Sequence, residues 1–428
     1  MRGARVIIAG GGWSGCAAAC SARKAGASVV LLERTDQLLG TGLVGGIMRN
    51  NGRFTATEEA RAMGAGDLFE LCDRLSRHRG VEFPGHKHAW LYDVAKVEPA
   101  VRALLGGMGV EVRLECRVTD VRADGTTMRA LVCESGERFE GDVFLDTTGT
   151  AGPQGNCTRY GNGCAMCILR CPSFGPRVSV AAAAGVEEFA GRSPAGSLGS
   201  MSGSCKLLKG SLSPEIVERL DMTGVAVVPV PEDLRKGDAP AFKSCQQYAL
   251  PEFADNLVLL DTGHAKLMAP YFPLGLLRRV PGMEHSRFED PYAGGKGNSM
   301  RFFSMSPRDD FLKVQGIANL FCAGEKAGPF VGHTEAIVTG SLAGHNAVRL
   351  ALGLPLLRIP ESLAAGDAIA FVGRMMSSGE GLAMRFTFSG SVYFDRMVGL
   401  GLYTTDRREI VRRVREAGME GVFAHRLA

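Results

Sequence analysis

The stretch R-V-I-I-A-G-G-G-W-S-G-C-A-A-A-C-S-A-R-K-A-G-A-S-V-V-L-L-E-R, residues 5–34, decides the fold. It reads as a short apolar strand, a glycine turn, a helix of small residues and a second apolar strand, the order of a βαβ unit. Gly10, Gly12 and Gly15 fit the spacing G-x-G-x-x-G. Because strand, turn, helix and acidic end agree within one window, the stretch predicts dinucleotide binding rather than a turn that is merely rich in glycine.

The three glycines and the acid that follows them have separate tasks in such a unit. Gly10 permits the sharp turn, Gly12 lets the backbone approach a pyrophosphate, and Gly15 lets helix and strand pack closely. The pyrophosphate is expected at the helix N-terminus, where free N–H groups and the helix dipole favour negative charge. Glu33 can bind ribose hydroxyls and would repel a 2′-phosphate, so FAD or NAD is favoured over NADP.

A second glycine-rich loop, residues 37–48, follows the acidic strand end directly and contains Gly45 and Gly46. In a flavoprotein such a loop runs beneath the rest of the FAD. The alternative is an ordinary surface loop.

The pattern up to Gly149 completes a first domain. Residues 57–79 read as helical, residues 83–91 as a solvated loop that holds His86 and His88, and residues 94–108 as a helix. Strands that form a β-meander are expected at residues 110–114, 116–122, 128–133 and 138–144. They run into an apolar strand at residues 143–149 that ends in Thr148 and Gly149, which would bring the chain back to the pyrophosphate.

Length and composition set the domain plan. The chain has 428 residues, of which 57 are glycine, and this length suits two or three domains. Residues 151–310 are rich in Gly, Pro and Ser with weak periodicity, and predict an inserted α+β substrate domain with its clearest strands at 225–230 and 257–260. Strong patterning returns at residues 311–354, and residues 355–428 read as a small helical appendage.

The segment 311–354 contains a strand at 320–323 and then a helix that begins near His333 and ends near Leu352. Thr334 can cap this helix, and small residues such as Gly340 and Gly344 would let it pack tightly. The predicted fold class is therefore α/β. A Rossmann-like FAD-binding domain of residues 1–150 and 311–354, with a parallel sheet and a β-meander, carries the inserted domain and the appendage.

Four of the 12 cysteines lie close together, in the pattern C-x6-C-x2-C-x3-C: Cys157, Cys164, Cys167 and Cys171. The pattern ends in Pro172 and is similar to the spacing of bacterial ferredoxins, so an iron–sulfur cluster of the 4Fe–4S type is favoured. Zinc is an alternative. A redox-active pair of Cys164 and Cys167 is another, because C-x-x-C lowers a thiol pKa. The remaining alternative is that the four cysteines are free structural thiols.

Charge and hydropathy limit the partners. The net charge of +4 is nearly balanced and does not favour a nucleic-acid partner. No apolar run approaches the roughly 18 residues of a membrane span, and the βαβ unit explains the N-terminal residues better than a signal peptide does. We expect a cytoplasmic homo-oligomer, a dimer, with a small-molecule or protein redox partner and no membrane contact.

Three segments together resemble a known class. They are the glycine motif with Glu33, the sequence D-T-T-G at 146–149, and the sequence A-G-E at 323–325 with G-H-T-E-A and the small-residue helix at 332–347. They resemble FAD-dependent oxidoreductases of the glutathione-reductase-like class. The last segment is similar to the glucose-inhibited division protein A family and to the folate-dependent tRNA uridine methyltransferase, FAD proteins that modify tRNA.

The resemblance implies a cofactor site. It would consist of Gly10, Gly12 and Gly15 at the pyrophosphate, Glu33 and Arg34 at the ribose, Gly45 and Gly46 in the loop beneath the cofactor, backbone near Val118 at the adenine, Thr148 and Gly149 at the pyrophosphate, Gly324 and Glu325 at the ribityl chain, and His333 and Thr334 at the flavin. His333 is the candidate catalytic residue. The tRNA enzymes carry a cysteine in the loop after the acidic strand, and residues 40–50 here contain none.

The function expected from these observations is that of an FAD-dependent oxidoreductase that passes electrons between a donor, the flavin and the four-cysteine site. No second βαβ unit with a G-x-G-x-x-G turn is expected, so NADH or NADPH would act as a transient donor, or a protein would deliver the electrons. The alternatives are a tRNA-modifying flavoprotein and an electron-transfer subunit of a larger complex.

Overall fold

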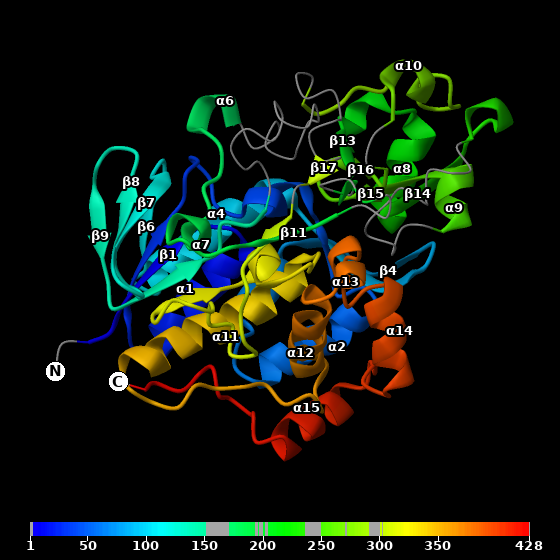
Figure 1. Ribbon diagram of the computed structural model, residues 1–428. Coiled ribbons are helices and arrows are strands. Elements are labelled where there is room, and N and C mark those ends of the chain that lie inside the picture. The colour runs from blue at the N-terminus through cyan, green and yellow to red at the C-terminus, as the bar shows by residue number, and fades with distance from the viewer. Residues whose placement is uncertain are drawn as a thin grey trace.

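The computed structural model describes residues 3–150, 171–192, 196, 200–201, 204–235, 250–269, 272–290, 300–301 and 303–427. No helix within these ranges is long and apolar enough to cross a membrane. The two chain ends lie on the same side of the molecule (Figure 1), and the backbone N–H of Leu427 donates to the carbonyl of Ala25 at 3.0 Å.

A five-stranded parallel sheet lies at the centre, in the order β19-β10-β1-β2-β6. Its strands are β1 (Arg5–Ala9), β2 (Ser28–Leu32), β6 (Glu111–Arg113), β10 (Val143–Asp146) and β19 (Leu320–Cys322). Strands buried on both faces need apolar side chains in succession, and every residue of β10 and β19 is buried. The predicted α/β class with a Rossmann-like parallel sheet is confirmed.

The β-meander is a three-stranded antiparallel sheet of β7 (Val118–Asp124), β8 (Thr127–Cys133) and β9 (Arg138–Glu140). Two of the expected strands belong elsewhere. Residues 110–114 supply β6, the edge of the parallel sheet. The expected strand 138–144 divides, because β9 ends at Glu140 and the apolar strand expected at 143–149 forms β10. The division falls at Gly141, where an added Cβ would lie 2.6 Å from the side chain of Ile7, so the chain passes close beneath β1 before β10 begins.

The prediction for residues 57–91 is wrong in part. The helical pattern covers α2 (Gly52–Ala62) and α3 (Asp67–Arg74), but the expected loop belongs to a hairpin of β4 (Ser76–Phe83) and β5 (His86–Tyr92), which pairs with β3 (Ile47–Met48). His86 is only 2% exposed. Its ring stacks on Phe83 at 4.6 Å and its Nδ1 lies 3.0 Å from Nδ2 of Asn50. It is therefore a packed structural residue of this hairpin.

Two helices cross over one face of the central sheet: α1 (Trp13–Lys24) and α11 (His333–Ala351). They approach through small residues. A Cβ added at Gly340 would lie 2.2 Å from the carbonyl oxygen of Ser14, and one at Gly344 would lie 2.2 Å from that of Ala18. The expected tight packing of this helix is thus observed. The expected Thr334 cap is wrong, because Gly332 occupies the N-cap position and Thr334 is buried in the first turn, two residues further along.

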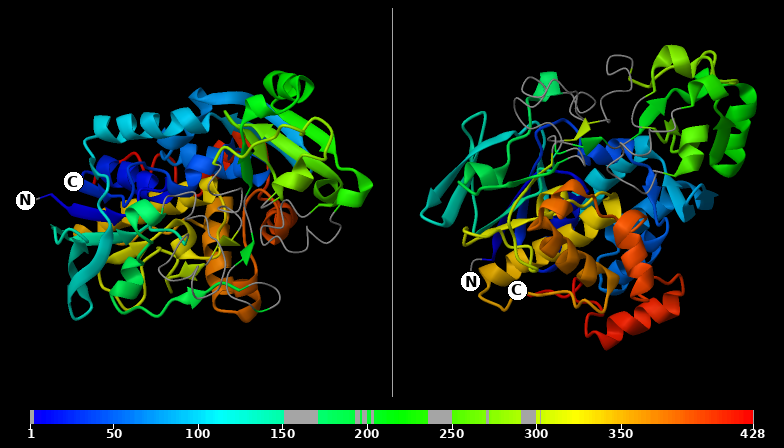
Figure 2. Two further views of the ribbon diagram at one scale, coloured as in Figure 1. Left: turned by 90° about the horizontal axis from the view of Figure 1, so that it is seen from above. Right: turned by 45° about the vertical axis from the view of Figure 1, so that its right-hand side comes forward.

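A second sheet stands apart from the parallel sheet, in the upper right of Figure 2. Its antiparallel order is β13-β16-β15-β14. The elements are β13 (Cys205–Leu207), α8 (Pro214–Thr223), β14 (Val225–Pro229), α9 (Pro251–Asp255), β15 (Asn256–Asp261), β16 (Ala265–Leu267) and α10 (Leu274–Leu277). Strands and helices share a hydrophobic core of their own. The two clearest strands expected in this region correspond to β14 and β15.

The remaining elements complete the described chain. They are η1 (Gly40–Val44), α4 (Val94–Gly107), α6 (Cys171–Phe174), α7 (Val180–Ala183), η3 (Lys209–Ser211), η4 (Glu232–Leu234) and η7 (Gly324–Ala327), with the strand pairs β11 (Phe189–Ala190) and β18 (Ser304–Met305), and β12 (Ser200–Met201) and β17 (Met300–Arg301).

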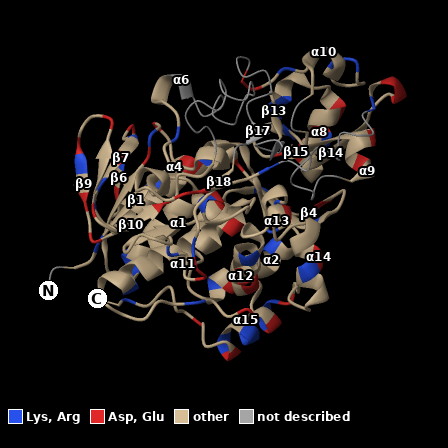
Figure 3. Ribbon diagram, viewed as in Figure 1, with Lys and Arg blue, Asp and Glu red and all other residues tan. Residues whose placement is uncertain are grey.

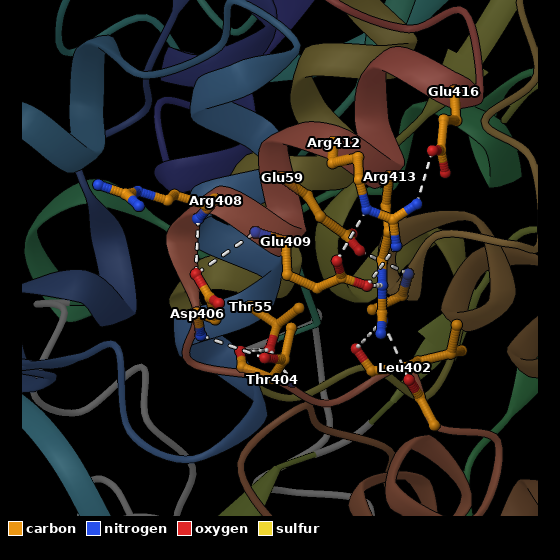
Figure 4. A network of polar contacts seen from close by, with 12 residues as sticks. Thr55, Glu59, Leu402, Thr404, Asp406, Arg408, Glu409, Arg412, Arg413 and Glu416 are labelled. Atoms are coloured by element: carbon orange, nitrogen blue, oxygen red, sulfur yellow. Dashed lines mark hydrogen bonds and ion pairs between the residues drawn. The ribbon is translucent and has the colours of Figure 1, made fainter.

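Four helices follow α11: α12 (Ala364–Met376), α13 (Gly379–Ala383), α14 (Ser391–Gly399) and α15 (Arg407–Glu416). Helices α12 and α15 pack on α2, and α13 packs on α12. The carboxylate of Glu59, which is labelled in Figure 4, accepts hydrogen bonds from the backbone N–H groups of Ala364 and Ala365, both at 2.9 Å, and so holds the start of α12. Basic and acidic residues alternate along α15 (Figure 3), where Arg412 pairs with Glu409 and Glu416.

Glu59 gives the fold a pH dependence that can be measured. Burial raises its pKa to about 7, against the hydrogen bonds from Ala365 and Ala364. An unfolded Glu titrates near 4.3, so this contribution to stability is full below about pH 4.3 and is lost as the pH rises through about 7, a change of roughly 3 kcal/mol. Glu59→Gln should therefore flatten the fall in unfolding free energy between pH 5.5 and 8, measured by urea denaturation.

The control is Glu416→Gln, which removes an exposed partner of Arg412 and should keep the wild-type pH slope. Equal slopes in wild type, Glu59→Gln and Glu416→Gln would show that Glu59 does not carry this proton uptake.

Candidate dinucleotide site

The turn between β1 and α1 can be made only with glycine at two positions. Gly10 has φ +101°, and an added Cβ would lie 2.5 Å from the carbonyl oxygen of Thr147. A Cβ at Gly15 would lie 1.9 Å from the carbonyl oxygen of Gly10. At Gly12, by contrast, a Cβ would meet nothing within 4 Å. The turn is closed on the protein side and open on the other, as a phosphate cradle requires.

The N-terminus of α1 faces this open side without a capping group. Its N-cap residue is Gly12, no side chain caps it, and no acidic residue lies in its first turn. The positive end of the helix dipole is therefore not neutralised by the helix's own side chains. The described residues of the turn fit a bound pyrophosphate.

Glu33 lies directly after β2 and is 7% exposed. One carboxylate oxygen accepts a hydrogen bond from the N–H of Gly11 at 2.8 Å, and the other accepts from the N–H of Thr35 at 2.9 Å. The backbone N–H of Cys116 donates to the Glu33 carbonyl at 2.8 Å. The two N–H donors hold the carboxylate against the glycine turn. Val118, the first residue of β7, follows Cys116 by two positions.

A cavity of about 330 Å³ opens beside Glu33. Its wall combines Glu33 and Arg34 with parts of residues 35–43 and the start of α4, and Lys206 and His264 close it from the second sheet. Burial lowers the pKa of Lys206 and of His264, and the positive charge of Lys206 adds to the shift at His264. Arg34 also donates from Nη1 to the carbonyl of Gly175 at 2.9 Å.

Asp146, the last residue of β10, organises the opposite side of the turn. It is fully buried and accepts hydrogen bonds from the N–H and hydroxyl of Thr148 at 3.1 and 2.7 Å and from the N–H of Ala181 at 3.0 Å. Burial alone would raise the pKa of Asp146, but the charge of Lys326 and these hydrogen bonds hold it below its usual value. Asp146 is therefore an ionised carboxylate, and it holds Thr148 in place through these hydrogen bonds.

Lys326 in η7 contacts Asp146, Ser304 and Glu188 on this side of the turn. Its Nζ lies 4.0 Å from Asp146, donates to the Ser304 carbonyl at 3.0 Å, and forms an ion pair with Glu188. The Lys326 side chain is fully buried, so its charge acts at low dielectric and is only weakly screened.

Predicted contact residues from distant segments meet at the start of α1. A Cβ at Gly10 would lie 2.8 Å from the Cα of Thr148, and one at Gly324 would lie 2.8 Å from the hydroxyl of Ser14. The hydroxyl of Thr150 hydrogen-bonds the carboxylate of Glu325, and Gly149 has φ +67° with open space where a Cβ would stand. The structure therefore brings 10–15, 148–149 and 324–325 together.

His333 lies in an aromatic group at the loop beneath the turn. Its Nδ1 is 3.3 Å from the hydroxyl of Tyr92, and its ring centroid is 5.8 Å from that of Trp13. A Cβ at Gly45 would lie 1.7 Å from the His333 ring, while Gly46, with φ +88°, packs against Thr262. Burial raises the pKa of Tyr92. Thr334, next along α11, is fully buried with its hydroxyl 3.9 Å from the sulfur of Met48.

Several residues of this region were not predicted. Trp13 stands inside the glycine motif, so its position could have been read from the sequence. Tyr92 and Lys326 belong to no motif, and their roles follow from contacts between distant segments. Arg177, 4% exposed, donates from Nη1 to the hydroxyl of Thr148 at 3.3 Å, and no sequence signal marked it.

The proposed metal ligands cannot be placed. Cys157, Cys164 and Cys167 lie outside the described residues, and Cys171 is the first residue of α6. Among the residues that the structure describes, no group of three or more His, Cys, Asp and Glu could hold a metal ion.

Comparisons with known proteins agree with this geometry. The family of FAD-dependent oxidoreductases matches residues 5–152, and the glucose-inhibited division protein A family matches residues 269–355. A methylenetetrahydrofolate–tRNA-(uracil-5-)-methyltransferase, TrmFO, from Methylobacterium radiotolerans is 33% identical over 112 residues. That match covers 26% of this chain and only 23% of the relative.

Solved structures show the same fold. GidA from Aquifex aeolicus superposes with a TM-score of 0.64 in one crystal form and 0.61 in another, at 13% identity in both. Each superposition covers 97% of this chain, with 76% and 78% of the GidA chain. Together with the family matches, this confirms the resemblance inferred from the sequence: the chain is similar to the FAD-dependent flavoproteins of the GidA and TrmFO type.

Proposed function

We propose that this chain is an FAD-dependent oxidoreductase whose substrate is a tRNA base. The observation that carries the first part is the open glycine turn, fixed to Glu33 on one side and to Thr148 on the other. The second part is supported by the matches to the GidA family and to TrmFO, whose name describes methylation of tRNA uracil.

The residues present would hold FAD in a definite order. Backbone N–H groups at the start of α1 would bind the pyrophosphate, Glu33 the adenosine ribose, and Gly324 and Glu325 the ribityl chain. FAD supplies two-electron chemistry when it is bound. His333, whose Nδ1 faces the hydroxyl of Tyr92, would then hold or pass a proton at its other ring nitrogen.

The loop of residues 40–50 bears on the kind of tRNA chemistry. It contains no cysteine, so a covalent step through a thiol of this loop is not part of the proposal. Electrons would come from NADH or NADPH bound transiently, or from a protein donor. We further propose that the chain acts as a homodimer.

The four cysteines support a second function. Their spacing favours electron transfer through an iron–sulfur cluster, with the flavin as the relay. Anaerobic purification followed by a visible spectrum and by iron and acid-labile sulfide assays would separate the two. Iron and sulfide in stoichiometric amounts favour electron transfer, and their absence together with tRNA binding favours base modification.

The proposed ribose ligand gives the first test of the cofactor site. In Glu33→Gln an amide NH₂ would face one of the two N–H donors, Gly11 or Thr35, and one carboxylate acceptor would be lost. Hydrogen bonds to a charged group contribute about 1.5–3 kcal/mol, so the Kd for FAD should rise about tenfold or more. Isothermal titration calorimetry measures this. Glu137→Gln, an exposed partner of Arg113, is the matched control, and equal Kd values for the two variants would remove Glu33 from the site.

The proposed substrate gives a separate test. Binding of unmodified tRNA to the full chain should be measured by filter binding between 50 and 200 mM salt, with a DNA duplex as the control. A tRNA substrate predicts affinity that falls with rising salt and exceeds the affinity for the duplex. Equal, weak binding of both would reject tRNA as the substrate while leaving the FAD assignment intact.

A further inference from the structure

Arg177 is a buried cation whose hydrogen bonding is incomplete. It is 4% exposed, and its one hydrogen bond among the described residues runs from Nη1 to the hydroxyl of Thr148 at 3.3 Å. Its Nε is buried without a hydrogen-bond partner in the described part of the chain. A guanidinium carries five N–H donors, so this side chain retains donors that the described protein does not satisfy.

The nearby carboxylates do not pair with it directly. Asp146, Glu188 and Glu325 act on Arg177 through their charge, yet burial dominates and lowers the pKa of Arg177. Each carboxylate has other partners. Asp146 binds Thr148 and Ala181, Glu188 forms an ion pair with Lys326, and Glu325 binds Thr150. A buried charge with no carboxylate partner among the described residues is costly, so its presence here calls for an anion.

The position of Arg177 identifies the anion. Its partner Thr148 touches the glycine turn, because a Cβ at Gly10 would lie 2.8 Å from the Thr148 Cα. The uncapped N-terminus of α1 faces the same turn. Helix dipole and guanidinium therefore favour negative charge at one place, between Gly12 and Thr148.

We propose that Arg177 binds the pyrophosphate of FAD, opposite the N-terminus of α1. This inference rests on the proposed FAD function and adds to it a side chain that contributes charge to a site otherwise made of backbone N–H groups. The glycine motif accounts for the approach of the backbone to the phosphates. Arg177 supplies positive charge from a segment more than a hundred residues further along the chain.

The test compares FAD and inorganic pyrophosphate binding by calorimetry in wild type, Arg177→Met and Arg177→Lys, all as full-length apo-protein. Loss of a charge-assisted contact should raise the Kd for FAD about tenfold to a hundredfold in Arg177→Met and abolish pyrophosphate binding. Arg177→Lys should recover part of both. Thermal unfolding of apo Arg177→Met should occur at the same temperature as wild type or higher, since an unpaired buried cation is removed, while the stabilisation by FAD should shrink.

Arg308→Met is the matched control. Arg308 is also buried, but its Nε and Nη2 donate to the carbonyls of Ala327 and Ile369 at 2.9 and 2.8 Å. This variant should lose apo stability and keep the FAD affinity of wild type. If Arg177→Met behaves in the same way, Arg177 is structural and the inference is wrong. Wild type that fails to bind FAD would instead overturn the proposed function.

Discussion

The contact between the backbones of α1 and α11 is the constraint on which the cofactor site depends. Gly340 and Gly344 bring α11 against the carbonyls of Ser14 and Ala18 in α1. Gly15 in turn brings α1 against the carbonyl of Gly10. Helix α1 is thus held between the strand turn and a second helix with no side chain between the backbones. Its N-terminus can point only at the open side of the turn, where a phosphate would bind.

The buried pair of Asp146 and Lys326 is the second constraint on the site. Asp146 and Lys326 face one another at 4.0 Å, both fully buried, and each is surrounded by hydrogen-bonding partners. A charge in such a place is stabilised only by fixed dipoles and counter-charges. This arrangement holds Thr148 and η7 in place, and through Thr148 it determines where Arg177 lies. The proposed cofactor site therefore combines a close-packed backbone cradle with a buried polar wall.

The sequence predicted the parts of this site that depend on local backbone requirements. Gly10, Gly15 and the acidic end at Glu33 could be recognised because a tight turn and a close helix contact allow few residue types. Gly340 and Gly344 could be recognised for the same reason. The network around Asp146 could not, because Lys326 reaches Glu188 across 138 positions and no local pattern records that contact. The sequence predicts a loop at residues 83–91, where β5 lies, because His86 looks solvated in the sequence, whereas Phe83 and Asn50 bury it.

The most direct test of this account is a substitution in α11 at its contact with α1. In Gly340→Ala the new methyl group would lie 2.2 Å from the Ser14 carbonyl oxygen, so α1 must shift. Gly106→Ala, at a helical position with nothing within 4 Å, is the control. If the helix contact positions the turn, Gly340→Ala should lower both the unfolding temperature and the affinity for FAD, and Gly106→Ala should lower neither. Wild-type FAD affinity in Gly340→Ala would contradict the account.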